Sequence, residues 1–233
     1  TPVIMTLHNY RLICPSGLLF HNNVIYEKAI DKGVFSTIID KVYRNSYLAT
    51  FSVARMIAYH KRKKTWHKKV DRMIALTDFA KSKFMESGFI TNNFSIKPNF
   101  VDDFNFNLDK EDYFVFVGRL SQEKGVGVLL DAFSINKKSL KIIGDGPMRE
   151  YVSDFCNKHD NISYLGFQKK DIIIEQLKKA KALIFTSLWY EGMPMTILES
   201  LSVGTPVIAP NIGSPSSIIN HGENGLIYNV SDV

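Results

Sequence analysis

The sequence predicts an α/β protein in which a Rossmann-like domain follows an earlier, incomplete domain. From residue 113 to residue 219, apolar segments of four to six residues alternate with segments of helical spacing. Strands of this length joined through helices form βαβ units, in which the strands lie parallel in a sheet that helices cover on both faces. A polar stretch separates this region from an earlier one that has its own strand and helix patterns.

The first region begins with an apolar run, residues 2–7, which ends at His8 and predicts a buried strand followed by a loop. No turn or helix signal precedes this run, so we expect the chain to start partway through a domain. Residues 26–64 carry apolar side chains at helical spacing, and Gly33 and residues 45–46 are predicted to divide them.

A second strand and helix follow. Residues 70–76 predict a strand, Asp78 a helix N-cap, and residues 79–87 a short helix that Gly88 closes. In the second region the predicted strands are residues 113–117, 140–143, 162–165, 182–185 and 206–209. The predicted helices are residues 125–133, 148–159, 172–179, 194–201 and the start of one at 214–219.

The polar and acidic residues 102–112 predict a linker. We therefore expect a partial domain over residues 1–107 and a nearly complete domain over residues 108–233. The charge divides in a similar way, because residues 1–109 carry 16 Lys or Arg and 9 Asp or Glu, whereas residues 110–233 carry 13 and 14. Two modules with different partners would explain that division.

The composition is that of a globular protein, with 45% hydrophobic residues in 233. It excludes a disordered tail, a collagen-like repeat and a disulfide scaffold. No apolar run approaches the ~18–20 residues that span a bilayer, and residues 1–10 lack the features of a signal peptide. The two cysteines, Cys14 and Cys156, favour a reducing compartment. We expect a soluble, cytoplasmic protein.

Ligands of open parallel sheets bind beyond the carboxyl ends of the strands, so the loops after the strands are candidate sites. The loop from Gly118 to Gly125 places two cations, Arg119 and Lys124, near the start of a helix. Because the amides and dipole of a helix N-terminus attract anions, this loop favours a phosphate or diphosphate. A solvated turn before an ordinary helix explains the loop equally well when it is taken alone.

Two further loops are weaker indicators of a site. Gly144 opens the sequence Gly-Asp-Gly-Pro, where glycine lets the backbone approach a ligand but also serves plain turns. Gly166 and Phe167 would offer backbone groups and an aromatic face to a flat base. A buried Phe167 is the simpler alternative.

A pair of carboxylates marks the loop after the fourth of these strands. Glu191 lies in the loop, the residues from Gly192 to Pro194 form the turn that starts a helix, and Glu199 lies within that helix. Each carboxylate can accept hydrogen bonds from two vicinal hydroxyls while the amides between them bind a phosphate or carbonyl, so the pattern suits a polyhydroxylated ligand. Taken separately, each acid is explained as a surface acid near a helix start.

In their order and spacing, these loops resemble the donor-binding half of the family 4 glycosyltransferases. These are retaining enzymes of the GT-B architecture, in which two Rossmann-like domains face each other across a cleft. The motifs are Gly118-Arg119 with Glu123-Lys124-Gly125, Gly144-Asp-Gly-Pro147, Leu165-Gly-Phe167, and Glu191-x7-Glu199 with its Gly-Met-Pro insert. In the first region, Thr6-Leu-His8-Asn-Tyr10, Ala75-Leu-Thr77 and Lys97-Pro-Asn-Phe100 resemble the later part of the acceptor-side domain. The first strands and the C-terminal tail of the family are missing, so we expect a fragment of a longer protein.

The resemblance implies that Arg119 and Lys124 bind the diphosphate of a nucleotide-sugar and stabilise the leaving group. Gly118 and Gly144 would lie in the loops that carry the donor. Glu199 would hold the ribose hydroxyls.

For the rest of the donor, the resemblance assigns the base to the loop of Gly166 and Phe167. His8 would lie across the cleft near the transferred sugar, although a lone histidine after a strand is more often structural. The sugar hydroxyls would bind Glu191 together with the amides of the segment Gly192, Met193, Pro194 and Met195.

The function implied is transfer of a sugar from a nucleotide-diphosphate sugar to a glycan or lipid-linked acceptor, as in bacterial surface-polysaccharide synthesis. No metal and no other cofactor is expected, because two cations and a helix N-terminus can offset the diphosphate charge. Retention without a carboxylate nucleophile would imply attack from the side of departure, with a phosphate oxygen as base. The alternatives are a nucleotide-sugar epimerase of GT-B fold, which is not expected to show the Glu191-x7-Glu199 pattern, and a catalytically silent nucleotide-sugar-binding module.

A basic segment in the first region points to location. Residues 55–72 contain eight Lys or Arg, two His and one acid. Cations interleaved with Tyr59 and Trp66 suit an anionic membrane surface, which predicts peripheral binding at the inner face of the cytoplasmic membrane. Nucleic acid is not an expected partner, since no binding motif accompanies the charge. A solvated helix face explains the segment equally well.

Overall fold

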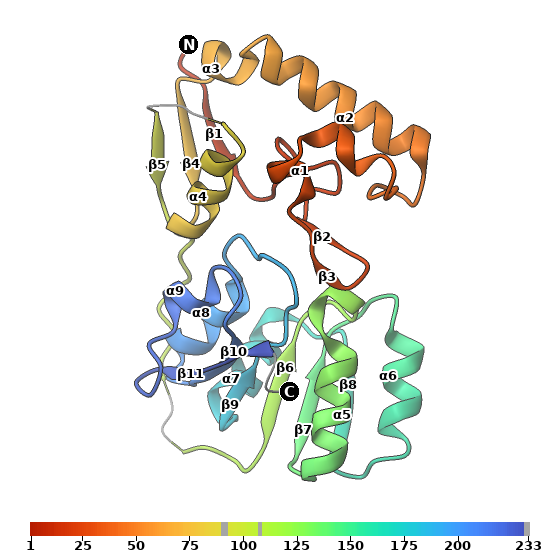
Figure 1. The fold of residues 1–233 in the computed structure, drawn as a ribbon. Helices are drawn as coiled ribbons and strands as arrows, with labels where there is room; N and C mark the ends of the chain where they lie inside the picture. The colour runs from red at the N-terminus through yellow and green to blue at the C-terminus, as the bar shows by residue number, and fades with distance from the viewer. Residues whose placement is uncertain (90–92, 107–108, 231–233) are drawn as a thin grey trace. The chain divides into compact units, whose positions relative to one another are not determined.

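The structure is a computed structural model that describes residues 1–89, 93–106 and 109–230 (Figure 1). The chain forms two compact units. Unit 1 comprises Thr1–Asn99 and Trp189–Met193, and unit 2 comprises Phe100–Leu188 and Pro194–Val233. Each unit contains a parallel β-sheet with helices, as the alternation of apolar segments predicted.

The two units divide the chain earlier than the predicted linker does. The predicted boundary between residues 107 and 108 falls outside the described residues. Phe104 packs against the core of unit 2, and a Cβ placed on Gly204 would lie 3.3 Å from the Cβ of Phe106. These phenylalanines, set among acids and asparagines, attach the polar stretch to unit 2.

Unit 1 contains a three-stranded parallel sheet with the order β1-β4-β5. The strands are β1 (Ile4–Leu7), β4 (Arg72–Ala75) and β5 (Phe94–Ile96). Leu7, Tyr10, Met73 and Phe84 are among the buried side chains that form its core. The strands predicted over residues 2–7 and 70–76 are therefore present.

The helical region of unit 1 is divided where the sequence predicted. Gly33 has a φ of +80°, and Ser46 caps the long helix that follows by accepting a hydrogen bond from the amide of Ala49. A hairpin before the first helix was not predicted; its turn residues Asn22 and Asn23 both have positive φ. The elements are β2 (Phe20–His21), β3 (Val24–Ile25), α1 (Lys28–Asp31), η1 (Val34–Thr37), α2 (Tyr47–Arg62) and α3 (Thr65–Lys69).

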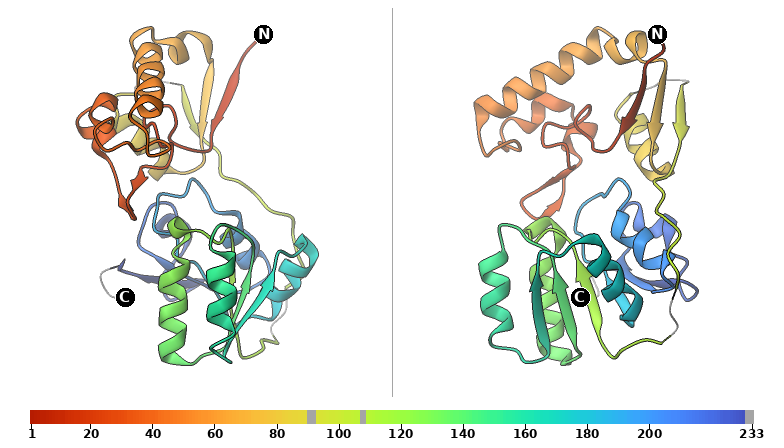
Figure 2. Two further views of the ribbon diagram at one scale, coloured as in Figure 1. Left: turned by 90° about the vertical axis from the view of Figure 1, so that its right-hand side faces the viewer. Right: turned by 180° about the vertical axis from the view of Figure 1, so that it is seen from behind.

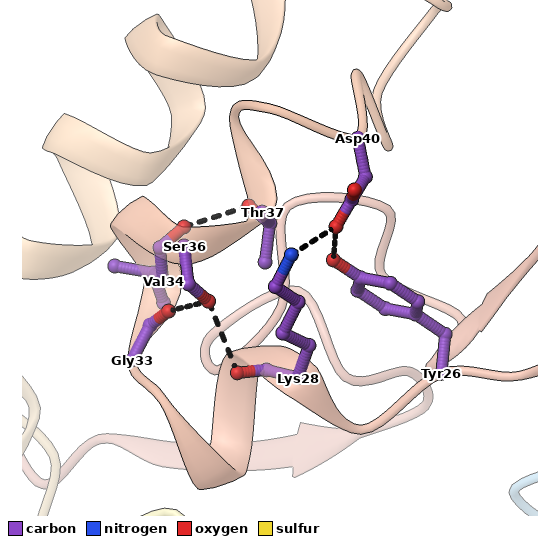
Figure 3. Close-up of polar contacts among 7 residues, drawn as sticks. All are labelled: Tyr26, Lys28, Gly33, Val34, Ser36, Thr37 and Asp40. Carbon is purple, nitrogen blue, oxygen red and sulfur yellow. Dashed lines mark hydrogen bonds and ion pairs between the residues drawn. The ribbon is translucent and has the colours of Figure 1, made fainter.

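A polar cluster holds the short helices α1 and η1 in place (Figure 3). The Asp40 carboxylate pairs with the Lys28 ammonium at 2.6 Å and accepts a hydrogen bond from the Tyr26 hydroxyl at 2.5 Å. The hydrogen bond from Lys28, followed by that from Tyr26, lowers the pKa of the Asp40 carboxyl. On η1, the Thr37 hydroxyl donates to the carbonyl oxygen of Val34 at 2.6 Å.

The predicted N-cap at Asp78 was wrong by one residue. Thr77 caps α4 (Asp78–Glu86), because its backbone is extended and its hydroxyl accepts from the amide of Ala80 at 3.1 Å. Asp78 is instead the first helical residue, where its charge favours the helix dipole. Gly88 follows the C-cap with a φ of +75°, as predicted.

Unit 2 contains a six-stranded parallel sheet with the order β11-β10-β9-β6-β7-β8. The strands are β6 (Phe114–Val117), β7 (Leu140–Ile143), β8 (Ile162–Gly166), β9 (Ala182–Ile184), β10 (Val207–Pro210) and β11 (Gly225–Tyr228). The helices are η2 (Gln122–Lys124), α5 (Val126–Asn136), α6 (Arg149–Cys156), α7 (Lys170–Lys179), α8 (Met195–Ser202) and α9 (Pro215–Ile218). All five predicted strands are present, and β11 adds a sixth that was not predicted.

Helices cover both faces of the unit 2 sheet (Figures 1 and 2). Val115 and Val117 of β6 belong to the core that includes side chains of α7 and α8. Phe114 and Phe116 belong to the core that includes side chains of α5 and α6. Because β6 pairs with both β7 and β9, the strand order reverses beside β6, which is where ligands of open parallel sheets bind. Within the described residues, no helix has both the length and the apolar character needed to cross a membrane.

Candidate functional site

Unit 2 contains a cavity of about 540 Å³ beside the loops that follow β6, β7 and β8. These are three of the four loops that the sequence singled out. Among the predicted site residues, Gly118, Arg119, Gly144 and Phe167 line it together. The other lining residues are Val117, Ile143, Asp145, Gly146, Gln168 and Ile173.

The loops of this cavity touch through their backbones. Gly144 has a φ of +146°, and a Cβ placed on it would lie 1.8 Å from the carbonyl oxygen of Gly118. The Gly144 amide donates to the carbonyl oxygen of Gly166 at 2.9 Å. A Cβ on Gly146 would lie 2.4 Å from the carbonyl oxygen of Leu120. Only glycine fits these contacts, so both glycines of the Gly-Asp-Gly-Pro loop are packing requirements as well as candidate binding residues.

The two predicted cations differ in position. Arg119 is exposed and lines the cavity. Lys124 ends η2 and is not among the described lining residues; its ammonium lies 6.0 Å from the ring centroid of Phe185. Gly125 follows with a φ of +68° and begins the turn into α5. Arg119 is therefore the cation that the described cavity presents to a ligand.

Phe167 lies on the surface, with an exposed fraction of 77%. The alternative of a buried phenylalanine was therefore wrong. Gly166 ends β8 with a φ of +71°, and this left-handed residue turns the chain just before the ring. An exposed phenyl ring at the cavity is available to stack against a flat base.

Glu199 lies on α8, and its side chain is 13% exposed. Burial raises the pKa of its carboxyl, and the Lys170 ammonium 4.0 Å away offsets part of that increase. Pro194 is the N-cap of this helix, and Met195 is its first residue and is exposed. Lys170, which begins α7, was not predicted as a site residue.

Glu191 belongs to unit 1 with the rest of Trp189–Met193, and it is 8% exposed. The Thr77 hydroxyl donates to the carbonyl oxygen of Gly192 at 3.4 Å. The side-chain amide of Asn99 donates to the carbonyl oxygen of Met193 at 3.3 Å.

The same segment lies beside His8 within unit 1. His8 is exposed at the end of β1, and a Cβ placed on Gly192 would lie 3.3 Å from the His8 carbonyl oxygen. The structure thus brings His8 and the segment of Glu191 together in unit 1, while Arg119 and Glu199 lie in unit 2. The roles predicted for these residues stay predictions.

Two residues that form hydrogen bonds with the segment of Glu191 were not predicted. Thr77 and Asn99 stand in motifs that carried the family resemblance, yet no role was assigned to them. Each follows a strand of the unit 1 sheet, β4 and β5, so the strand-end rule used for the second region would have found them. Within the described ranges, no group of three or more His, Cys, Asp or Glu is placed to hold a metal ion.

Each of the two units contains a parallel sheet with helices, and unit 2 has a cavity at the ends of its strands. Solved structures with this fold belong to the class of GT-B glycosyltransferases. A lipopolysaccharide outer core galactosyltransferase, WaaB, superposes with a TM-score of 0.59 over 70% of this chain and 49% of its own, at 29% identity. HepE of Anabaena, solved with UDP-glucose, superposes with a TM-score of 0.64 over 98% of this chain and 58% of its own, at 18% identity. The second likeness concerns the fold alone.

Residues 100–233 match the family described as glycosyl transferases group 1, and the chain belongs to this family. An uncharacterized glycosyltransferase of Methanocaldococcus jannaschii is 28% identical over 208 residues, which are 83% of this chain and 52% of the relative. Lipopolysaccharide 1,6-galactosyltransferase of Escherichia coli K12 is 35% identical over 130 residues, 52% of this chain and 36% of the relative. The chain thus spans about half the length of these relatives, or less.

Proposed function

We propose that this chain is part of a family 4 retaining glycosyltransferase that moves a sugar from a nucleotide-diphosphate sugar to a glycan or lipid-linked acceptor. The observation that carries the proposal is the cavity of unit 2, where an exposed arginine, glycine-rich loops and an exposed phenyl ring meet. A cation for the diphosphate, backbone that can approach it and an aromatic face for the base are what a nucleotide requires. Relatives named for lipopolysaccharide galactosyl transfer support a role in bacterial surface-polysaccharide synthesis.

In this proposal Arg119 and Lys124 bind the diphosphate, and Glu199 binds the ribose. Glu191 binds the sugar hydroxyls with the amides that follow it, and His8 lies near the transferred sugar. No metal takes part, because the cations and the N-terminal amides of α5 stabilise the charge of the leaving diphosphate. The acceptor attacks from the face that the diphosphate leaves, and a phosphate oxygen takes its proton.

Thermal unfolding with a panel of UDP-glucose, UDP-galactose, UDP-N-acetylglucosamine and GDP-mannose, all in excess EDTA, tests donor binding. A donor present at 100 times its Kd stabilises a protein by about 2.7 kcal/mol, which raises Tm by roughly 5–10 °C in a chain of this size. At least one donor should produce such a shift, and Arg119→Ala should weaken its binding at least tenfold.

The matched control is Lys138→Ala, which removes an exposed cation of unit 2 outside the cavity lining and should leave the shift unchanged. If no donor shifts Tm, the proposed donor site is refuted. If the shift appears only when Mn²⁺ is added, the metal independence of donor binding is refuted.

We also propose that unit 1 binds the anionic inner face of the cytoplasmic membrane through residues 55–72. From residue 41 to residue 70 the chain has nine Lys or Arg and no acid. On α2, Leu48, Met56 and Tyr59 are exposed beside these cations. Trp66 contributes less than the sequence indicated, because it packs against the core of unit 1. Apolar and aromatic side chains among cations suit the headgroup region.

Vesicle sedimentation tests this surface. Binding should be stronger to phosphatidylglycerol vesicles than to phosphatidylcholine vesicles, because each cation near an anionic surface contributes ~1 kcal/mol. Replacing Lys63, Lys64, Lys68 and Lys69 with Gln should lower the partition coefficient at least tenfold. The control removes the same charge from unit 2, at the exposed Lys137, Lys138, Lys158 and Lys169. Equal and weak binding to both vesicles would refute the proposal.

A further inference from the structure

The segment that carries Glu191 has no helical or strand hydrogen bonds of its own, so its position depends on side chains around it. After Glu191 in the chain, Thr77 and Asn99 donate hydrogen bonds to the carbonyl groups of Gly192 and Met193. Before Glu191, the side chain that packs against unit 1 is the ring of Tyr190.

Tyr190 belongs to a cluster of side chains in unit 1 with Phe79 and Lys83 of α4 and with Glu27, the residue before α1. Its ring meets the ring of Phe79 edge-on, with centroids 4.7 Å apart and planes at 66°. Burial, followed by the influence of Glu27, raises the pKa of Tyr190 to about 12. The edge-to-face contact with Phe79 fixes the plane of the Tyr190 ring.

Lys83 contacts both the carboxylates and the rings of this cluster. Its ammonium is 2.8 Å from Glu27 and 2.9 Å from Glu86, and its side chain is 13% exposed. The same ammonium lies 5.6 Å from the ring centroids of both Phe79 and Tyr190. Burial lowers the pKa of Lys83, but the hydrogen bonds to Glu27 and Glu86 outweigh it and raise the pKa overall, so the lysine is charged at neutral pH.

Tyr10 joins this cluster to the core of unit 1, because its side chain is part of the core against which Tyr190 packs. Burial, followed by the charges of Tyr190, Glu191 and Glu27, raises the pKa of Tyr10. The Tyr10 hydroxyl is buried without a hydrogen-bond partner among the described residues. Tyr190 is therefore held between the core of unit 1 and the side chains of Phe79 and Lys83.

We propose that Lys83 and Tyr190 are positioning residues that hold the Glu191 carboxylate in its binding geometry. The inference rests on the proposed function of Glu191. Lys83 orders Glu27 and the two rings, Glu27 and Phe79 orient Tyr190, and Tyr190 fixes the backbone directly before Glu191. Neither Lys83 nor Tyr190 contacts the donor in this scheme, so the loss of either changes the placement of Glu191 without removing any group that binds the nucleotide.

The chain contains a natural probe for this placement. It has two tryptophans, Trp66 and Trp189, and Trp189 directly precedes Tyr190. In a Trp66→Phe background, fluorescence therefore reports on the segment alone, with no substrate present. Lys83→Met and Tyr190→Ala should each raise the acrylamide quenching constant of Trp189 at least twofold. Lys83→Arg keeps the positive charge, so its quenching constant for Trp189 should equal that of the parent.

Lys81→Met is the matched control, because Lys81 lies on the same helix and is half-buried like Lys83. It should leave the quenching constant unchanged. If Lys83→Met and Tyr190→Ala fold with the circular dichroism of the parent and the quenching does not change, the proposal is overturned. Tyr190→Phe removes only the hydroxyl, so it keeps the proposal testable if the larger changes prevent folding; its quenching should rise by a smaller factor.

Kinetics of the full-length protein separate this proposal from the proposed function. With the donor found in the thermal screen, Lys83→Met should lower kcat at least tenfold while the KM for the donor changes less than threefold. Should Glu191→Ala abolish transfer and Lys83→Met leave kcat intact, the positioning role alone is refuted. Should both variants leave transfer intact, the role of Glu191 in the proposed function is refuted as well.

Discussion

Glu191→Ala is expected to lower the transfer rate of the full-length protein by about 10²–10⁴-fold, with the fold kept. The carboxylate can accept hydrogen bonds from two vicinal hydroxyls of the transferred sugar. Each hydrogen bond to a charged group contributes ~1.5–3 kcal/mol, and each 1.36 kcal/mol is about tenfold in rate. The loss should appear in kcat, because the sugar ring changes shape and charge in the transition state whereas the nucleotide does not.

The measurement is the initial rate of sugar transfer, with the anomeric configuration of the product determined by NMR. Glu150→Ala is the control, since Glu150 is an exposed acid of unit 2 on α6 and does not line the cavity. Unchanged transfer by Glu191→Ala would favour another role for the residue. A parent protein that binds donor but never transfers sugar would favour the silent binding module.

The central strands of unit 2 could be predicted because they are largely buried on both faces. Residues 113–117 and 182–185 are short apolar runs between helical segments, and β6 and β9 match them to within one residue. A buried parallel strand needs apolar side chains on both faces, so the whole run stands out from its surroundings. The hairpin of β2 and β3 could not be found in this way, because strands of two residues are too short to show a period.

The helix cap of α4 shows what local sequence leaves open. Thr77 and Asp78 are both good N-cap residues, and the sequence does not say which one has the extended backbone. Thr77 takes that position because β4 ends at Ala75 and the chain is still extended at residue 77. The strand that precedes the helix therefore decides the cap, and this is a matter of chain geometry.

The residues of the candidate site could also be predicted only in part. Gly118, Arg119, Gly144 and Phe167 could be assigned to one cavity because each follows a strand of a parallel sheet, and parallel strands end at one edge. The cluster of side chains around Lys83 could not be predicted. Its partners come from a loop, a helix and a segment far along the chain, and no periodic pattern joins them.

Gly144→Ala is expected to lower the free energy of unfolding by about 2–5 kcal/mol. The new Cβ would lie 1.8 Å from the carbonyl oxygen of Gly118 and 2.9 Å from its carbonyl carbon. Both neighbours are backbone atoms, so no side chain can rotate away to relieve the contact. The φ of +146° adds strain, because L residues with a Cβ rarely adopt it.

Chemical denaturation followed by circular dichroism measures this effect, and Gly127→Ala is its control. A Cβ on Gly127 would meet no atom within 4 Å, and the residue lies in α5, so alanine should stabilise the protein by up to ~1 kcal/mol. If Gly144→Ala were as stable as the parent, the close approach of the two loops would be disproved. Donor binding should also fall in Gly144→Ala, since the contact that must open joins the loops of Arg119 and Asp145, and both of these residues line the cavity. Because Gly127 lies outside that lining, its variant should bind donor like the parent, so the pair separates loss of the cavity from a general change in stability.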